Sequence, residues 1–297
     1  MTPDDIAAEL APLGPPVMVF CASHSGSRLL ARGLSELGVF MGARLNQSFD
    51  SLDLFDFVRW LVGLDDPGFE RVLAGEAPDL RERTIGAMRA HLIGRPDGAP
   101  WGWKLPETAN VLPVMTRLFP HARLIHLIRD GRDVAFSPFV APKDPFWRRI
   151  YFGDPTLKSW RGLSMTQRAY RAHGHMFNAQ RWVRSVTLGA AGADLARGRY
   201  LELRYERLAA EPAAELGRAA AFLGMPFRPQ VASAIGTTTA AIGKWRLQPP
   251  KSLAEIRPIL EPTLGRFGYA WEEGEVSAGS GAEPGGLGGL FRVRTRR

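Results

Sequence analysis

Six consecutive residues, Ser23-His-Ser-Gly-Ser-Arg28, form a stretch that could bind an anion. They follow a short apolar run, Val17-Met-Val-Phe-Cys21, which predicts a buried strand, and leucines at helical spacing come after them. Small residues between a strand and a helix let several backbone N–H groups point inward, and the helix N-terminus adds partial positive charge. Ser25 and Ser27 can also donate hydrogen bonds, so we expect a phosphate or sulfate site.

This stretch differs from two better-known loops. A Walker A phosphate loop needs Gly-Lys followed by Ser or Thr, but Gly243-Lys244 is followed by Trp245. The Gly-x-Ser-x-Gly signature of a hydrolase nucleophile cannot be aligned with Ser25. The plain alternative, a serine-rich turn that only caps a helix, stays open.

Two further cations follow apolar runs. Trp101-Gly-Trp-Lys104 predicts a short strand that ends on a lysine. Arg123-Leu-Ile-His-Leu-Ile128 predicts a buried strand, and Arg129 comes directly after it. Either cation could serve an anionic ligand, or Arg129 could simply cap a helix and Lys104 could be a surface lysine.

The elements that must position these residues alternate between strands and helices. A fourth strand is predicted at residues 199–204, and helices are predicted near 28–37, 50–94, 105–119, 165–188, 205–224 and 252–264. This alternation predicts an α/β fold of three layers, in which a central parallel sheet carries helices on both faces. Residues 138–162, rich in Pro, Gly and aromatics, are predicted to form a long loop or lid.

The chain divides into a long folded part and a short tail. We expect one domain over residues 1–271 and a disordered tail over 272–297, which contains Gly and Ser and ends in Arg-Val-Arg-Thr-Arg-Arg297. The acidic and basic residues of the tail balance, so the formal net charge of +8 belongs to the folded part. A length of 297 residues is ample for a substantial core.

Composition excludes some classes of protein and leaves others open. The sequence pI near 10.1 suggests an anionic partner, which could be nucleic acid, a membrane surface or a small molecule. Cys21 is the only cysteine, which excludes an internal disulfide framework and fits a reducing compartment. We see no signal peptide and no apolar run long enough to cross a membrane, so we expect a cytoplasmic protein.

Five segments, in order along residues 17–246, together resemble the PAPS-dependent sulfotransferases, where PAPS is 3′-phosphoadenosine 5′-phosphosulfate. The segments are the Ser23–Arg28 turn, Trp103-Lys-Leu-Pro106, Arg129 with Ser137 eight residues later, Arg204-Tyr-Glu-Arg-Leu208, and Gly243-Lys-Trp-Arg246. The resemblance implies a P-loop-like fold and in-line transfer of a sulfuryl group from PAPS to a hydroxyl or amine, without a metal. The acceptor would be a small molecule, a carbohydrate or a lipid.

The resemblance also implies roles for individual residues. It assigns the sulfuryl group and the bridging oxygen to Lys104, and the 3′-phosphate to Arg129 and Ser137. It assigns the adenine end to Tyr205 and to Trp245 with Lys244. The 5′-phosphate would be held by Ser23, His24, Ser25, Gly26, Ser27 and Arg28.

Two positions depart from the family pattern. His24 stands where the family usually has Lys or Arg, and a histidine is only half charged near pH 6.5, so Arg28 could supply the missing charge. The histidine that cytosolic relatives place beside the motif lysine is absent, because Lys104 is followed directly by Leu105-Pro106. The resemblance implies a carboxylate instead, because other branches of the family use one after the first helix as the base. The candidates here, which could also be helix caps or first-turn acids, are Asp50, Asp53 and Glu107.

Rival functions remain at this stage. The chain could bind PAP, the desulfated donor, or PAPS without catalysing transfer, which the histidine at position 24 favours. Nucleic-acid binding is less expected, since the arginines of residues 161–184 could equally line an anionic cleft or face solvent. His173 and His175 lack a nearby carboxylate or cysteine at metal-ligand spacing, so we expect no metal site. The aromatics of residues 138–162 could face the acceptor.

Overall fold

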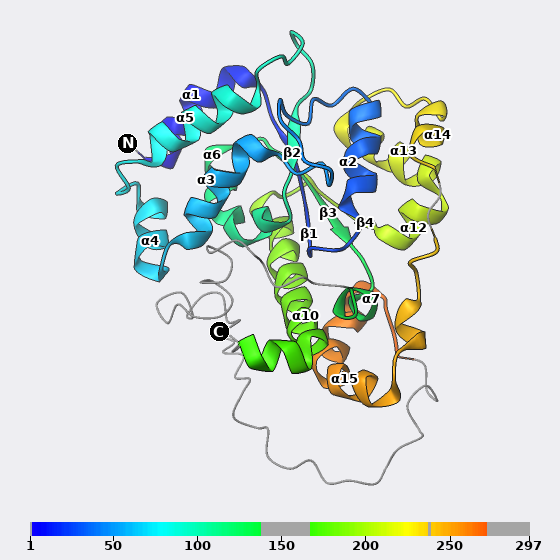
Figure 1. The fold of residues 1–297 in the computed structure, drawn as a ribbon. Helices are drawn as coiled ribbons and strands as arrows, with labels where there is room; N and C mark the ends of the chain where they lie inside the picture. The colour runs from blue at the N-terminus through cyan, green and yellow to red at the C-terminus, as the bar shows by residue number, and fades with distance from the viewer. Residues whose placement is uncertain (1, 138–166, 237–238, 272–297) are drawn as a thin grey trace. The chain divides into compact units, whose positions relative to one another are not determined.

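Four parallel strands form a sheet in the order β2-β1-β3-β4, which confirms the predicted parallel sheet (Figure 1). The strands are β1 (Val17–Cys21), β2 (Gly102–Lys104), β3 (Arg123–Ile128) and β4 (Tyr200–Arg204). The computed structural model describes residues 2–137, 167–236 and 239–271 of the chain. Every residue of β1 is buried, which explains why its sequence is continuously apolar and not alternating.

The register of the sheet brings the ends of β1 and β2 together. Val19 of β1 is the partner of Lys104 in β2, so the lysine lies near the carboxyl end of β1. The two strands approach closely at Gly102, where an added Cβ would lie 2.1 Å from the carbonyl oxygen of Val17. A glycine is therefore required at the start of β2.

The chain forms two compact units, Met1–Arg129 with Ser185–Ala240, and Asp130–Arg184 with Ala241–Arg297. The sheet lies wholly in the first unit. Our expectation of one domain over residues 1–271 stays a prediction, and the predicted tail and the predicted lid lie outside the described residues. The part of the chain that the structure describes contains no helix with the length and apolar character needed to cross a membrane.

Helices of the first unit lie on both sides of the sheet (Figure 1). On one side are α1 (Pro3–Leu10), α3 (Leu52–Gly63), α4 (Asp66–Ala74), α5 (Leu80–His91) and α6 (Leu112–Leu118). On the other are α2 (Ser27–Glu36), α12 (Tyr205–Ala210), α13 (Pro212–Leu223) and α14 (Gln230–Ile235). This is the predicted α/β arrangement.

The predicted helical stretch over residues 50–94 is divided into three helices, α3, α4 and α5. Asp65 caps α4 by accepting a hydrogen bond from the backbone N–H of Gly68 at 2.8 Å. Gly75 ends α4 with a φ of 79°, a left-handed conformation that glycine adopts at little cost. The predicted helix over 105–119 similarly divides into a 3₁₀ helix, η2 (Pro106–Val111), and α6.

The second unit contains a buried arginine, Arg132, that connects several of its elements. It contains α7 (Gly131–Ala135), η4 (Lys244–Leu247), α15 (Pro250–Leu264), η5 (Gly265–Phe267) and most of α10 (Gln167–Ala190). Arg132 donates to both carboxylate oxygens of Asp130 and to the carbonyl of Ala270, and its guanidinium carbon lies 3.9 Å from the ring centroid of Trp245. Charge-assisted bonds and the aromatic face thus satisfy a cation that would otherwise be costly to bury.

Candidate functional site

The loop that follows β1 has the backbone shape expected of an anion site. His24 has a φ of 71° and Gly26 a φ of 74°, and α2 begins at the next residue, Ser27. Among the described residues, no side chain caps this end of α2. Because the first N–H groups of a helix have no partner within the helix, those of Ser27 and Arg28 can donate to a ligand, whereas that of Leu29 donates to the carbonyl oxygen of Gly26 at 3.0 Å.

Tyr205 fixes the path of this loop. An added Cβ at Gly26 would lie 2.2 Å from the Tyr205 ring, so no other residue fits there without displacing the ring. Tyr205 is buried and is the first residue of α12, directly after β4. The glycine thus meets two needs at once, a left-handed φ and close contact with an aromatic face.

Arg129 connects the loop to the next strand of the sheet. Its Nη1 donates a hydrogen bond to the carbonyl oxygen of His24 at 3.1 Å, and its guanidinium carbon lies 4.8 Å from the ring centroid of Tyr205. In the order β2-β1-β3-β4, the chain leaves β1 toward one edge and β3 toward the other. Ligands of parallel α/β sheets bind at the carboxyl ends of strands at such a point, which is where Arg129 and the loop lie.

The buried hydroxyl of Ser25 bears on whether this loop can bind a phosphate. Its side chain is 1 % exposed, and its Oγ has no hydrogen-bond partner among the described residues. A buried hydroxyl without a partner is unusual in a folded protein and often marks a ligand position. A phosphate oxygen would accept this hydrogen bond, so the donor set of the loop fits an anion.

Lys104 and Asp50 form an ion pair beside the same loop. The Lys104 ammonium donates to Oδ1 of Asp50, and the lysine is 2 % exposed while the aspartate side chain is 22 % exposed. Burial raises the pKa of the neighbouring Cys21 thiol to about 11, and the charges of Lys104 and Asp50 act on the same thiol. This places the pair close to the end of β1.

The structure separates the three candidate carboxylates. The side chain of Asp53 is buried and bound to Arg44, whose Nε lies 2.6 Å from its Oδ1. Asp50 faces Lys104, and its other carboxylate oxygen accepts a hydrogen bond from the Asn46 amide at 2.9 Å. Glu107, three residues after Lys104, is half-buried, and its charge helps to raise the pKa of the Cys21 thiol. The structure thus shows Asp50 bonded to the lysine and Asp53 bonded to Arg44.

Sequence reasoning missed a buried pair of residues next to Asp50, namely Ser51 and His91. His91 and Ser51 are both fully buried, and Nδ1 of His91 lies 2.9 Å from Oγ of Ser51. Nε2 of His91 lies 3.0 Å from the carbonyl oxygen of Gly102. The sequence does place a serine, Ser51, next to Asp50. Its partner His91 lies 40 positions further along the chain, and a single sequence cannot reveal such a distant contact.

The burial of His91 predicts a loss of stability in acid. Burial lowers the pKa of His91 to about 4, whereas an unfolded histidine titrates near 6.5. Between these values the unfolded chain binds a proton that the folded chain does not, so stability is full above pH 6.5 and falls toward pH 4. We expect this group to remove about 2 kcal/mol from the free energy of unfolding between pH 7 and pH 5.

Urea unfolding at pH 7, 6 and 5 measures this effect. His91→Gln is the matched control, because its amide keeps one donor and one acceptor but does not titrate. The wild-type protein should lose about 2 kcal/mol more than the variant over this range. An identical loss in both proteins would contradict the assignment of this acid sensitivity to His91.

The remaining predicted site residues lie in the second unit. Ser137 donates from Oγ to the carbonyl oxygen of Asp133 at 3.0 Å, and Lys244 is exposed. Trp245 is buried, with Arg132 over its ring, and its backbone N–H donates to the carboxylate of Asp133 at 3.1 Å. The structure therefore gives Trp245 a packing role, and the roles of Ser137, Lys244 and Trp245 toward a nucleotide stay predictions.

His175, one of the two histidines considered above as metal ligands, contacts a carboxylate. Nε2 of His175 lies 2.6 Å from Oε2 of Glu255, a carboxylate that the sequence spacing did not reveal. Within residues 2–137, 167–236 and 239–271, no group of three or more His, Cys, Asp or Glu side chains could hold a metal ion.

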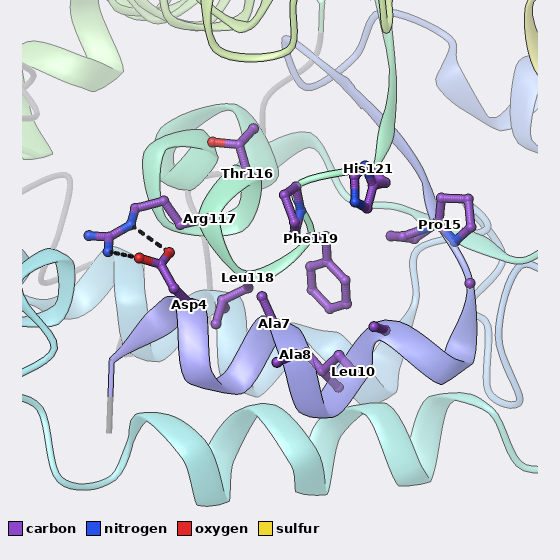
Figure 2. A pocket seen from close by; sticks show the side chains of 14 residues that line it. Asp4, Ala7, Ala8, Leu10, Pro15, Thr116, Arg117, Leu118, Phe119 and His121 are labelled. Atoms are coloured by element: carbon purple, nitrogen blue, oxygen red, sulfur yellow. Dashed lines mark hydrogen bonds and ion pairs between the residues drawn. The ribbon is translucent and has the colours of Figure 1, made fainter.

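A groove of about 720 Å³ lies elsewhere in the first unit, against α1 (Figure 2). Its lining is mostly apolar, with small residues such as Ala7 and Ala8 on α1, and Arg117 is paired with Asp4 at 2.9 Å beside it. Residues just before β1 and β3 line it, so it lies at the amino ends of the strands. Ligands of parallel sheets bind at the opposite ends, so we do not assign the chemistry to this groove.

Comparison with known proteins agrees with this geometry. A family model described as the sulfotransferase family matches residues 15–229. Over 167 residues the chain is 28 % identical to carbohydrate sulfotransferase 3 of Mus musculus, a match that covers 50 % of this chain and 34 % of that protein. Over 128 residues it is 28 % identical to a Caenorhabditis elegans protein that bears a protein-tyrosine sulfotransferase name, covering 43 % of this chain and 41 % of that protein.

The matched segments thus span less than half the length of these curated relatives, whose names differ in acceptor. Among solved structures, the sulfotransferase domain from the curacin biosynthetic pathway superposes with a TM-score of 0.51 at 18 % identity. This match covers 87 % of this chain and 99 % of that one, and it shows a shared fold.

Proposed function

Because the chain belongs to the sulfotransferase family, we propose that it transfers a sulfuryl group from PAPS to a hydroxyl or amine of a small-molecule, carbohydrate or lipid acceptor. PAPS supplies the sulfuryl group when it is bound. The observation that carries the proposal is the buried ammonium of Lys104, which lies beside the loop after β1 and is bonded to Asp50. A cation held there neutralises the negative charge that shifts to the leaving phosphate as the sulfur–oxygen bond breaks.

The loop and Arg129 are the proposed binding groups. The N–H groups at the start of α2 and the Ser25 hydroxyl would donate to the 5′-phosphate. Arg129 would pair with the 3′-phosphate, since a guanidinium matches two phosphate oxygens at once. Ser137 would add one hydrogen bond to that phosphate, and Tyr205 and Trp245 would serve the adenine.

Asp50 is the proposed general base. Its carboxylate would accept the proton of the attacking hydroxyl or amine as the acceptor atom bonds to sulfur and the bond from sulfur to the 5′-phosphate breaks. The pair with Lys104 would then place the proton acceptor and the charge-neutralising group on the same reacting centre.

One experiment separates this proposal from the alternative without catalysis. The protein is titrated with PAP by calorimetry, then incubated with PAPS and panels of sugars, phenols and lipids, and products are searched for the mass of an added sulfuryl group. PAP binding with a sulfated product supports the proposal. Binding without any product would favour the alternative, consistent with an exposed His24 at the loop, and an absence of binding would overturn both.

Arg129 gives a test of how the donor is recognised. We expect Arg129→Ala to weaken PAP binding by about 30-fold, because a charge-assisted pair to the 3′-phosphate is lost. Binding of adenosine 5′-phosphate, which lacks that group, should fall by less than about threefold. Arg207→Ala, an exposed change in the same unit, serves as the control. An equal loss for both nucleotides would contradict a 3′-phosphate role.

We also propose a cytoplasmic location. The single thiol, Cys21, is buried and cannot form an internal disulfide, which suits a reducing compartment. Fractionation of cells that express the tagged full chain would test this proposal directly. Recovery of the protein in a membrane or lumenal fraction would contradict it.

A further inference from the structure

We propose that Ser51 and His91 form a buried hydrogen-bonded pair that positions Asp50 against Lys104, which makes His91 a positioning residue of the site. The importance of that geometry for sulfuryl transfer rests on the proposed function. The contacts of Ser51 and His91 are independent of the proposed function, because they follow from distances between buried groups.

The neighbours of His91 determine which ring nitrogen carries its proton. Nε2 lies 3.0 Å from the carbonyl oxygen of Gly102, and a carbonyl oxygen can only accept. Nε2 must therefore be protonated, which leaves Nδ1 as an acceptor for the Ser51 hydroxyl at 2.9 Å. The ring thus joins the start of α3 to the start of β2 through two bonds of defined direction.

Ser51 lies at the N-terminus of α3, where the side chain of a serine usually caps the helix. It is the N-cap residue of α3, and a serine there usually accepts a hydrogen bond from the first turn of the helix. Here its side chain makes no such cap, and its hydroxyl is bonded to His91. Its own N–H donates to the carbonyl oxygen of Lys104 at 3.3 Å. Ser51 is therefore connected to β2 by two routes, one direct and one through His91.

Asp50 lies in the segment 42–51, and we infer that the path of this segment depends on these connections. Phe49, the residue before Asp50, has a φ of 61°, a strained conformation for a bulky residue. Such strain persists only where the surroundings hold it. At the other end of the segment, an added Cβ on Gly42 would lie 2.6 Å from the His91 ring, and the N–H of Ala43 donates to the carbonyl oxygen of His91 at 3.0 Å. His91 thus contacts both ends of the segment.

Chemical labelling of Lys104 tests the pair without requiring turnover. The full-length protein is treated briefly with acetic anhydride, and modification of Lys104 is measured by mass spectrometry relative to exposed Lys251. In the wild-type protein the buried, paired amine should react slowly. Ser51→Ala should raise the rate at Lys104 by about tenfold, because loss of one buried hydrogen bond increases the opened fraction by that factor.

Two further variants decide the interpretation. His91→Phe keeps an aromatic ring but removes both bonds, and it should raise the labelling rate at least as much. Thr84→Val removes a buried hydroxyl from α5, the helix that also carries His91. This hydroxyl donates to the carbonyl oxygen of Leu80, and the variant should leave the rate unchanged. A wild-type rate in Ser51→Ala, or an equal increase in Thr84→Val, would overturn the proposal. Neither result depends on whether the protein transfers sulfuryl groups.

Discussion

Replacing Lys104 by methionine is expected to lower kcat by about 10³-fold while leaving the affinity for PAP within about threefold of the wild type. Methionine fills nearly the same volume in a 2 % exposed position, so the packing beside β1 should survive. The lost ammonium is the group proposed to neutralise charge as the sulfur–oxygen bond breaks. PAP has no sulfuryl group, so its binding should depend on the loop and on Arg129 and little on Lys104.

The measurement compares kcat, the dissociation constant of PAP and the melting temperature of the variant. Lys251→Met, which removes an exposed lysine of α15, is the control for the loss of one positive charge. A variant that binds PAP, melts normally and keeps more than a tenth of the wild-type kcat would contradict the role proposed for Lys104. A parallel loss of PAP binding would instead indicate that Lys104 supports the loop.

The strand, turn and helix that carry the loop could be predicted because their signals are local. Five consecutive apolar residues predict a strand that is buried on both faces, and β1 is such a strand. Small residues then mark the turn, and regularly spaced leucines mark α2. The same logic located β2 and β3, and with them Lys104 and Arg129 at the carboxyl ends of their strands.

The pairings within the site could not be predicted, because they join residues far apart in the chain. Lys104 pairs with a carboxylate 54 positions away. The sequence favoured Asp50 over Glu107 and Asp53 as the base, but it could not show which of them contacts the lysine. Only the fold shows that Asp53 is bound to Arg44. The neighbours of Trp245 could not be predicted either: the structure places Arg132 against its ring, and the predicted contact with a nucleotide stays a prediction.

Replacing Asp50 by asparagine is expected to lower kcat by about 10²-fold, the usual effect of removing a general base. Asparagine has the same shape and can still accept a hydrogen bond from Lys104, so the loop should keep its path. It cannot take up a proton. The loss should therefore be greatest for acceptors with weakly acidic hydroxyls and smallest for acidic phenols, which are partly ionised without a base.

Comparison with Asp53→Asn distinguishes a base from a structural carboxylate, because Asp53 is buried against Arg44 and not against Lys104. That variant should lower the melting temperature more than kcat, with a loss that does not depend on the acidity of the acceptor. The decisive quantity is thus the slope of activity against acceptor acidity, measured with the acceptors that the mass screen identifies. A change of slope in Asp50→Asn alone would assign proton transfer to Asp50, whereas equal slopes in both variants would leave Asp50 only as the ion-pair partner of the buried Lys104 ammonium.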